Sequence, residues 1–187
     1  MMITRRKFVG GMAAAGMASV VGGSALAAER QKLPIAAVVT EYRNNAHADV
    51  IVGKVLEGWK QDGKAGPDLK LVSMYTDQVP KGDLSRDLAK KHGLPIVKTI
   101  EQAILQPAGD DRIEGVLSIG EHGNYPYVPK TRQHMYPRRR FFDEIAATFR
   151  KQGKSVPLFN DKHLSYSFVK AQKMVAASKR LGFPMLA

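Results

Sequence analysis

From residue 33 to residue 187 the chain alternates short apolar runs with longer stretches whose apolar positions recur every three or four residues. Short apolar runs bounded by turn residues are typical of buried strands. They lie at 33–40, 69–76, 94–99, 116–119 and 155–160, and a further run begins at 183. Amphipathic stretches predict helices, and these lie at 46–60, 83–93, 99–105, 138–153 and 165–182. Strands that alternate with helices predict a doubly wound α/β fold in three layers, with a mostly parallel sheet between helices.

Residues that favour helix ends support these boundaries. The positions typical of a C-cap glycine are occupied by Gly93, Gly153 and Gly182. Side chains that can cap a helix N-terminus are expected at Asp83, at Ser165 and at either Asn44 or Asn45. The apolar face of the first helix is predicted to include Trp59.

The first 27 residues predict a secretory signal peptide. They have a basic start, an apolar middle and a small-x-small end at 25–27. Arg5 and Arg6, followed by Lys7 and two apolar residues, match a twin-arginine export signal. We predict cleavage after Ala27 and a soluble periplasmic or otherwise extracytoplasmic chain with no stable membrane anchor. An uncleaved anchor is the alternative.

The mature chain, residues 28–187, is long enough for one domain with its own core. It has no cysteine, which excludes disulfides and thiolate chemistry. Removal of residues 1–27 takes away three positive charges and lowers the net charge from +12 to +9. The basic residues are scattered and no nucleic-acid-binding motif is present, so we expect a small-molecule ligand and no nucleic acid.

Polar residues follow each predicted strand. They are Glu41, Arg43, Asn44, Asn45 and His47 after the first strand, Asp77 and Gln78 after the second, Glu121, His122 and Asn124 after 116–119, and Asn160, Asp161, Lys162 and His163 after 155–160. Because ligands of open α/β sheets bind at the carboxyl ends of the strands, this placement predicts a functional cleft there. A polar rim without function is the alternative.

Two kinds of chemistry suit these residue types. His47, His122 and His163, with Glu41, Glu121 and Asp161, form a ligand set for Zn²⁺ or a similar ion, although no HExxH spacing is present. The other possibility is proton transfer or anion binding by Lys162 beside Asp161 and His163. The alternative without function is that Lys162 only forms an ion pair with a carboxylate.

Two further segments are expected near the carboxyl edge of the sheet. The run 138–140, three arginines at the start of a helix, is disfavoured by the helix dipole, and predicts either an anionic partner or a solvated face. The irregular stretch 120–137 is long for a loop, and such loops are often functional. Tyr125, Tyr127 and Tyr136 in it either line a pocket or pack.

The order of four blocks resembles the N-terminal domain of the glucose-fructose oxidoreductase / inositol dehydrogenase (Gfo/Idh/MocA) family. The blocks are "AKKHGLPIVKTIEQAIL", "IEGVLSIGEHGNY", "GKSVPLFNDKHLS" and the helix leading to "GFPMLA". The resemblance implies a Rossmann-like domain, an oxidoreductase activity and an NAD(P) cofactor. It places Lys162 at the lysine of the family's "EKP" motif, Asp161 at its Glu and His163 at its Pro, with Glu121 and His122 near the family's polar pair. The segments "NDKHLS" and "YPRRRFF" also resemble those of a group of exported proteins.

The chain departs from that family in three places. "TEYRNNAHAD" (40–49) replaces the glycine-rich turn that lets a pyrophosphate approach the backbone. The family's C-terminal domain is missing, which predicts either a truncated two-domain protein or an oligomer that covers an exposed apolar sheet face. The stretch 120–137 is an insertion.

We therefore expect a Rossmann-like domain that binds a small polar ligand or nucleotide at the carboxyl edge. Asp161, Lys162 and His163 would act there, with the binding residues Glu41, Arg43, Asn44, His47, Asp77, Glu121 and His122 around them. A metal-dependent site and a non-catalytic binding module are the alternatives.

Overall fold

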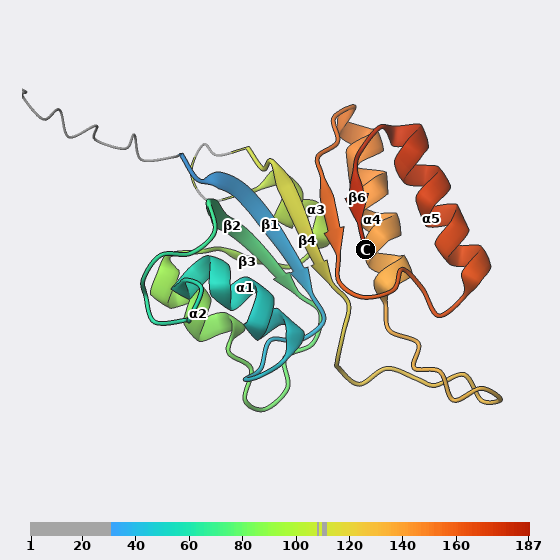
Figure 1. The fold of residues 1–187 in the computed structure, drawn as a ribbon, viewed down its shortest axis with the longest axis horizontal. Helices are drawn as coiled ribbons and strands as arrows, with labels where there is room; N and C mark the ends of the chain where they lie inside the picture. Colours follow the sequence, from blue (N-terminus) through green and yellow to red (C-terminus); the bar gives the residue numbers. More distant parts are fainter. Residues whose placement is uncertain (1–30, 108, 110–111) are drawn as a thin grey trace, which may run out of the picture.

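The fold is a twisted six-stranded sheet in which all strand pairs are parallel (Figure 1). The computed structural model describes residues 31–107, 109 and 112–187; the predicted signal peptide lies outside them. The strands are β1 (Leu33–Val39), β2 (Leu69–Thr76), β3 (Ile96–Val97), β4 (Gly115–Ile119), β5 (Leu158–Asn160) and β6 (Met185–Leu186). Their order is β3-β2-β1-β4-β5-β6, which is the Rossmann order with its reversal between β1 and β4. The predicted doubly wound α/β fold is confirmed.

Helices cover both faces of the sheet. They are α1 (His47–Glu57), α2 (Ser85–His92), α3 (Ile100–Leu105), α4 (Arg138–Gln152) and α5 (Phe168–Leu181). Buried residues of α1 and α2 share one apolar cluster with the sheet, and those of α3, α4 and α5 share another. Right-handed crossovers that run first toward β3 and then toward β6 place the two sets of helices on opposite faces.

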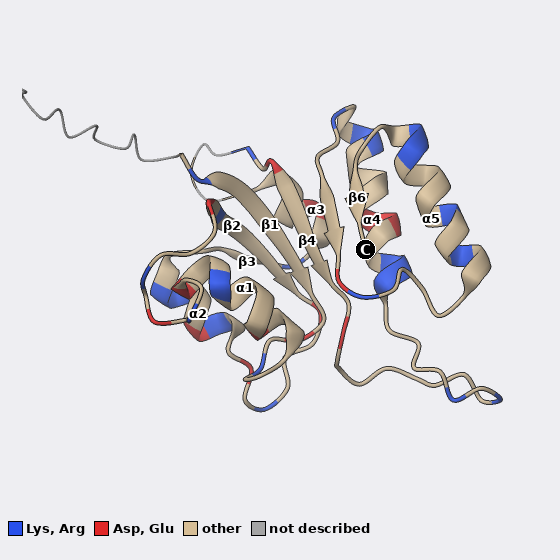
Figure 2. Ribbon diagram, in the orientation of Figure 1, with Lys and Arg blue, Asp and Glu red and all other residues tan. Residues whose placement is uncertain are grey.

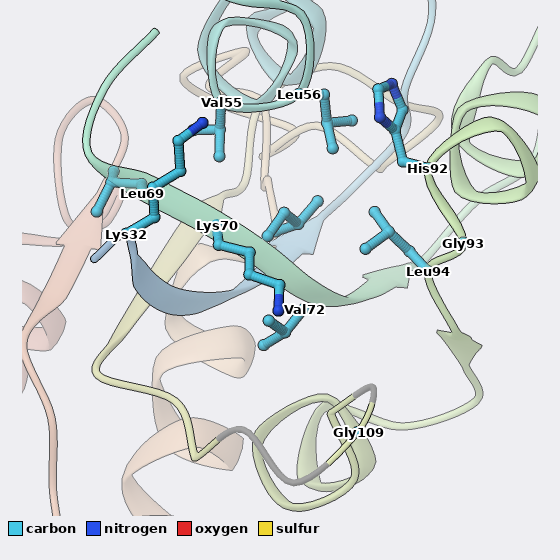
Figure 3. A pocket seen from close by; sticks show the side chains of 11 residues that line it. Lys32, Val55, Leu56, Leu69, Lys70, Val72, His92, Gly93, Leu94 and Gly109 are labelled. Atoms are coloured by element: carbon cyan, nitrogen blue, oxygen red, sulfur yellow. The ribbon is translucent and has the colours of Figure 1, made fainter. Parts of the chain in front are cut away.

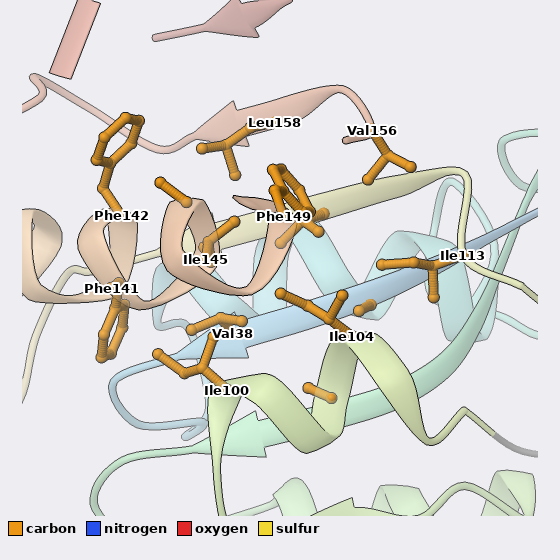
Figure 4. Close-up of a cluster of buried hydrophobic side chains, with 14 of the residues drawn as sticks. Val38, Ile100, Ile104, Ile113, Phe141, Phe142, Ile145, Phe149, Val156 and Leu158 are labelled. Carbon is orange, nitrogen blue, oxygen red and sulfur yellow. The ribbon is translucent and has the colours of Figure 1, made fainter. Parts of the chain in front are cut away.

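The larger cluster holds the second half of the fold in place. Phe141, Ile145 and Phe149 of α4 are almost wholly buried, at the spacing that the sequence predicts (Figure 4). They pack toward the sheet, where Val38 and Leu158 belong to the same cluster. Burying a side chain of this size stabilises the fold by roughly 1.5–3 kcal/mol. This packing fixes where α4 begins, at the carboxyl edge of the sheet.

Helix ends match the sequence at the C-termini and differ at the N-termini. Gly93, Gly153 and Gly182 adopt the predicted left-handed C-cap conformation. The predicted N-caps are wrong: the N-cap of α1 is Ala46, that of α2 is Leu84, and that of α5 is Ser167. A capping side chain must reach the N–H groups of the first turn. Asp83 instead accepts a hydrogen bond from the Ser85 hydroxyl, at 2.6 Å.

The side of β6 that faces away from α4 and α5 is open. Leu158 and Met185 pair in register and pack with the α4 and α5 cluster. Phe159 and Leu186, each one residue further along, lie on the other face because side chains alternate along a strand. Leu186 is 67% exposed, and no helix covers this face of β5 and β6 in Figure 1. Trp59, expected on the buried face of the first helix, is 58% exposed in the turn that follows it.

A cavity of about 520 Å³ lies at the amino edge of the sheet, away from the strand ends that carry the predicted site. Its walls include Val55 and Leu56 from the end of α1, Leu69 at the start of β2, and Leu94 after α2 (Figure 3). Two further cavities of about 360 Å³ lie beside α3 and α4. The carboxyl edge therefore has to be judged from its side-chain contacts. Across the part of the chain that the structure describes, no helix is both long and apolar enough to cross a bilayer.

Candidate functional site

His47 and Asp161, 114 residues apart in sequence, meet at the carboxyl edge of the sheet. His47 begins α1 and Asp161 directly follows β5, and their Nδ1 and Oδ2 atoms are 2.6 Å apart. The carboxylate is 10% exposed and the imidazole 28%. A carboxylate beside Nδ1 holds the proton on that nitrogen and leaves Nε2 to exchange one with a ligand. The pair is therefore built like an oriented acid–base group.

The backbone after β5 is shaped to place Asp161. The Asp161 N–H donates to the Ser118 carbonyl at 2.9 Å, which continues the β4–β5 ladder by one residue. The buried Asn160 amide donates to the carbonyls of Asp161 and Lys162, at 3.3 and 3.2 Å. Lys162 itself is exposed and adopts a φ of 64°, which is unusual for a residue other than glycine. This tight turn directs Asp161 inward and leaves Lys162 at the rim.

His122 lies beside His47 in the turn after β4. The two ring centroids are 5.2 Å apart. Burial, and then the positive charge of Arg43, lower the pKa of His122, so its ring is neutral at pH 7. Its Nδ1 is buried and has no hydrogen-bond partner among the described residues, and its φ is 68°. A buried unpaired nitrogen and a strained backbone at one residue are features that cluster at functional sites.

Arg138, the first residue of α4, is buried at the same edge and is 1% exposed. Its Nη2 pairs with the Glu121 carboxylate, and its Nη1 donates to His163 Nε2 at 3.1 Å. Burial, and then Arg138, lower the pKa of His163, which keeps that ring neutral. Gly120 makes room for this arginine, because a Cβ there would lie 2.7 Å from Arg138 Cγ.

Arg138 is therefore used inside the molecule, whereas Arg140 is partly exposed to solvent, and an anionic partner for the run stays a prediction. Arg139 pairs with Asp143 within α4, and Arg140 pairs with Asp77 at 2.6 Å. Sequence analysis missed Arg138 as a site residue. A cation at the start of a helix is unfavourable unless a carboxylate compensates it. That rule could have predicted a carboxylate partner for Arg138.

Asp77, which follows β2, forms a separate cluster. Its carboxylate accepts hydrogen bonds from Tyr75 at 2.5 Å and Tyr125 at 2.6 Å, and pairs with Arg140. Burial alone would raise the pKa of Asp77, but the bonds from Tyr125, Tyr75 and Arg140 lower it below the ordinary value. Burial, and then the bond to Asp77, raise the pKa of Tyr125. Because every partner is a residue of this chain, Asp77 anchors the loop that contains Tyr125.

The turn that replaces the glycine-rich sequence is filled by its own side chains. Glu41 is buried and pairs with Arg43, and the Thr40 hydroxyl donates to the Glu121 carbonyl. The Asp49 carboxylate accepts from the Asn45 N–H at 2.9 Å, where an anion would approach the start of α1. A pyrophosphate would meet three carboxylates here, those of Glu41, Asp49 and Asp161. The described residues do not fit a dinucleotide held on bare backbone.

The predicted site residues fall into three groups. His47, His122 and Asp161 come together; Glu121 and His163 are joined through Arg138; Asp77 lies in its own cluster. Arg43, Asn44 and Lys162 are exposed at the rim. Among the residues that the structure describes, no group of three or more His, Asp or Glu side chains is arranged to hold a metal ion.

A second histidine–carboxylate pair shows that such a pair alone does not define a site. His92 Nε2 lies 2.5 Å from Glu57 Oε1 where α1 and α2 end, and Lys91 bonds the same carboxylate at 2.8 Å. That carboxylate has a lysine and a histidine as partners, and neither His92 nor Lys91 has a positive φ. It provides an internal control for His47.

The sheet order, with its reversal between β1 and β4, defines a Rossmann-like α/β domain. Its fold is that of the N-terminal portion of the Gfo/Idh/MocA family oxidoreductases. A family member from Vibrio cholerae superposes with a TM-score of 0.50 at 18% identity, over 83% of this chain and 38% of that one. Apo scyllo-inositol dehydrogenase from Lactobacillus casei superposes with a TM-score of 0.50 at 10% identity, over 83% and 36%. No family model and no curated protein sequence matches the chain.

The fold that the sequence resemblance implies is thus confirmed. The chain spans less than two fifths of the length of either solved structure.

Proposed function

We propose that this Rossmann-like domain binds a small polar ligand at the carboxyl edge of its sheet, and that His47 exchanges a proton with a hydroxyl or carbonyl oxygen of that ligand. The observation that carries the proposal is the 2.6 Å contact between His47 Nδ1 and Asp161 Oδ2. Asp161 orients the imidazole through Nδ1, while Nε2 remains available. His122, neutral and 5.2 Å away between ring centroids, provides a second polar group.

The rim residues suit an oxygen-bearing ligand. Lys162 stands next to Asp161 and brings a positive charge to the edge, where it would orient an oxygen of the ligand. The carboxylates of Glu41 and Asp161 favour ligand hydroxyl groups, which donate hydrogen bonds, over phosphates, which accept them. The proposal therefore departs from the dinucleotide expected of the fold family, and no step in it uses a nicotinamide.

Ligand binding can be tested with two sets of probes. Purified protein is titrated calorimetrically with a panel of polyols, monosaccharides and small hydroxy acids, and separately with NAD(H) and NADP(H). We expect saturable binding from the first panel and none from the dinucleotides at millimolar concentration. Saturable dinucleotide binding would contradict the proposal, and so would the absence of binding from the first panel.

The role of His47 has a matched control in the chain. Asp161→Asn and His47→Asn are expected to weaken binding about tenfold or more, since a charge-assisted hydrogen bond is lost. His92→Asn removes the histidine of the other histidine–carboxylate pair and should leave the affinity unchanged. Equal losses in the two histidine variants would mean that a general effect on the fold, rather than a site, is being measured.

We also propose that the chain is exported through the twin-arginine pathway, on the support of the segment "TRRKFV" and the small-x-small end at residue 27. Replacing Arg5 and Arg6 together by Lys should retain the protein in the cytoplasm, as cell fractionation would show. Lys32→Arg, a change of the same size outside the signal, should not alter export. Export that persists in the paired variant would rule out this pathway.

A further inference from the structure

The helix α5 carries cations and no carboxylate. Its 14 residues include Lys170, Lys173, Lys179 and Arg180, all of them exposed. Each of the other four helices that the structure describes contains at least one Asp or Glu. In Figure 2 α5 is marked in blue without red, on the outer side of the molecule. Its outer surface is therefore uniformly positive.

The same surface exposes apolar side chains. Phe168 is 76% exposed and Val169 58%, both in the first turn of the helix, and Val175 is 38% exposed. The inward side is occupied by Met174 and Ser178, which are buried. Phe168 thus does not belong to the core, although α5 has a buried side that could have taken it. Phe168 and Val169 are adjacent and together form a small exposed apolar patch in the first turn of α5.

The apolar and cationic side chains share one outer strip. At 100° per residue, positions 168, 172, 175 and 179 lie along one line of the helix, and 169, 173, 176 and 180 along the adjacent line. Phe168 and Val169 therefore lie one to three turns from the cations on the same side. Lysine and arginine stems lie along an apolar surface while their charged ends reach outward. Exposed apolar side chains flanked by cations favour a membrane interface, because buried apolar area and attraction to anionic lipids both strengthen such binding.

We propose that the outer face of α5 docks on an anionic lipid surface. The positive charges attract the headgroups, and Phe168 and Val169 enter the boundary between headgroups and acyl chains. The face is a convex helix rather than a groove, which suits a flat, deformable partner better than a folded acidic protein. The contact is peripheral and reversible, and it is independent of the ligand site at the carboxyl edge.

The test is cosedimentation of the full chain with vesicles. One set is phosphatidylcholine alone and the other contains phosphatidylglycerol at about one lipid in three. We expect the protein to pellet with the anionic vesicles only, and to be released as salt is raised, because the attraction is screened. Equal binding to neutral vesicles, or none to anionic ones, would overturn the proposal. Polyglutamate that binds the protein when anionic vesicles do not would identify an acidic polypeptide as the partner instead.

Matched variants distinguish the contribution of α5 to vesicle binding from that of the overall charge. All variants share the N-terminal segment, so differences between them do not come from it. Lys173→Gln with Lys179→Gln should lower the partition coefficient roughly tenfold or more. Lys60→Gln with Lys81→Gln removes the same charge from exposed turns and should have little effect. Phe168→Ser with Val169→Ser should weaken binding severalfold at unchanged net charge. An equal loss in the two lysine pairs would show that only net charge matters.

A spectroscopic reading of insertion uses the single tryptophan. In a Trp59→Phe background, Phe168→Trp places the only indole on α5. Its emission should shift to shorter wavelength with anionic vesicles and stay unchanged with neutral ones. Circular dichroism of each variant confirms that the fold is retained. An emission that does not shift while the protein pellets would contradict insertion of the first turn of α5.

Discussion

Two carboxylates lie at the same edge of one sheet and have opposite surroundings. Asp77, after β2, is saturated by two tyrosine hydroxyls and a guanidinium, whereas Asp161, after β5, has one histidine. A carboxylate that already accepts from three side-chain donors has little capacity left for a ligand. One that orients a single imidazole leaves that imidazole available. Polar residues at strand ends are therefore not equivalent, and their contacts distinguish anchors from reactive groups.

The backbone follows the same division. Beside Asp161 and His47, Lys162 and His122 hold left-handed conformations that residues other than glycine avoid. Residues 75–78, around Asp77, include none. Strain of this kind costs about 1–3 kcal/mol per residue and persists only where the surroundings impose it. The backbone strain, which lowers the stability of the fold, therefore lies on the side of the edge that contains His47.

The largest effect should come from Asp77. Asp77→Ala leaves Arg140, Tyr75 and Tyr125 without their acceptor, and should lower the free energy of unfolding by about 2 kcal/mol, less than for a fully buried pair because Arg140 is 43% exposed. Asp161→Ala should cost less than about 1 kcal/mol. Urea denaturation of both variants measures this. A greater loss from Asp161→Ala would reverse the assignment of the two groups.

The same carboxylate predicts how stability changes with pH. The pKa of Asp77 is lower in the folded chain than its unfolded value of about 3.9. Its contribution is therefore fully present above the unfolded pKa and is lost as the pH falls through the folded pKa. The difference in unfolding free energy between the wild type and Asp77→Asn should shrink as the pH falls below about 4. A difference that stays constant down to pH 2 would show that folding does not lower the pKa of Asp77.

On the strained side of the edge, a substitution at Lys162 should raise the free energy of unfolding rather than lower it. Lys162→Gly removes the side chain at a φ of 64° and should raise the free energy of unfolding by about 0.5–1 kcal/mol while weakening ligand binding. Lys130→Gly, at an exposed lysine outside the set with positive φ, should not stabilise the protein. Thermal unfolding compares the two. A loss of stability from Lys162→Gly would mean that its side chain supports the fold.

The smallest effect concerns His122. Burial and Arg43 lower the pKa of His122, so its NMR titration midpoint should lie below that of free histidine, with the signal assigned by comparison with His122→Gln. Arg43→Gln should move the midpoint toward the ordinary value, because a nearby positive charge is removed. Arg86→Gln, an equal change on α2, should leave it in place. A midpoint above the ordinary value would indicate a closer carboxylate than any described.

The sequence predicted what depends on periodicity and missed what depends on single hydrogen bonds. The buried face of α4 and the C-cap glycines follow from spacing and backbone conformation, and both were predicted correctly. The carboxyl edge was predictable because parallel strands end together. The contact of His47 with Asp161 joins two segments that no local pattern relates. Ser165 and Ser167 have the same capping propensity, so the sequence did not distinguish them, and Ser165 was predicted where Ser167 caps.

The loop that follows β4 also affects how the two halves of the sheet can move. It leaves the half that contains β4 and α4 and crosses to the half that contains β2. There Gln78 exchanges two hydrogen bonds with Asn124, at 3.0 and 2.8 Å, and Tyr125 reaches Asp77. The pairing of β1 with β4 and the His47–Asp161 and Arg140–Asp77 contacts also join the two halves at this edge. The loop 120–137 therefore adds a connection that restrains the two halves of the sheet from moving apart at this edge.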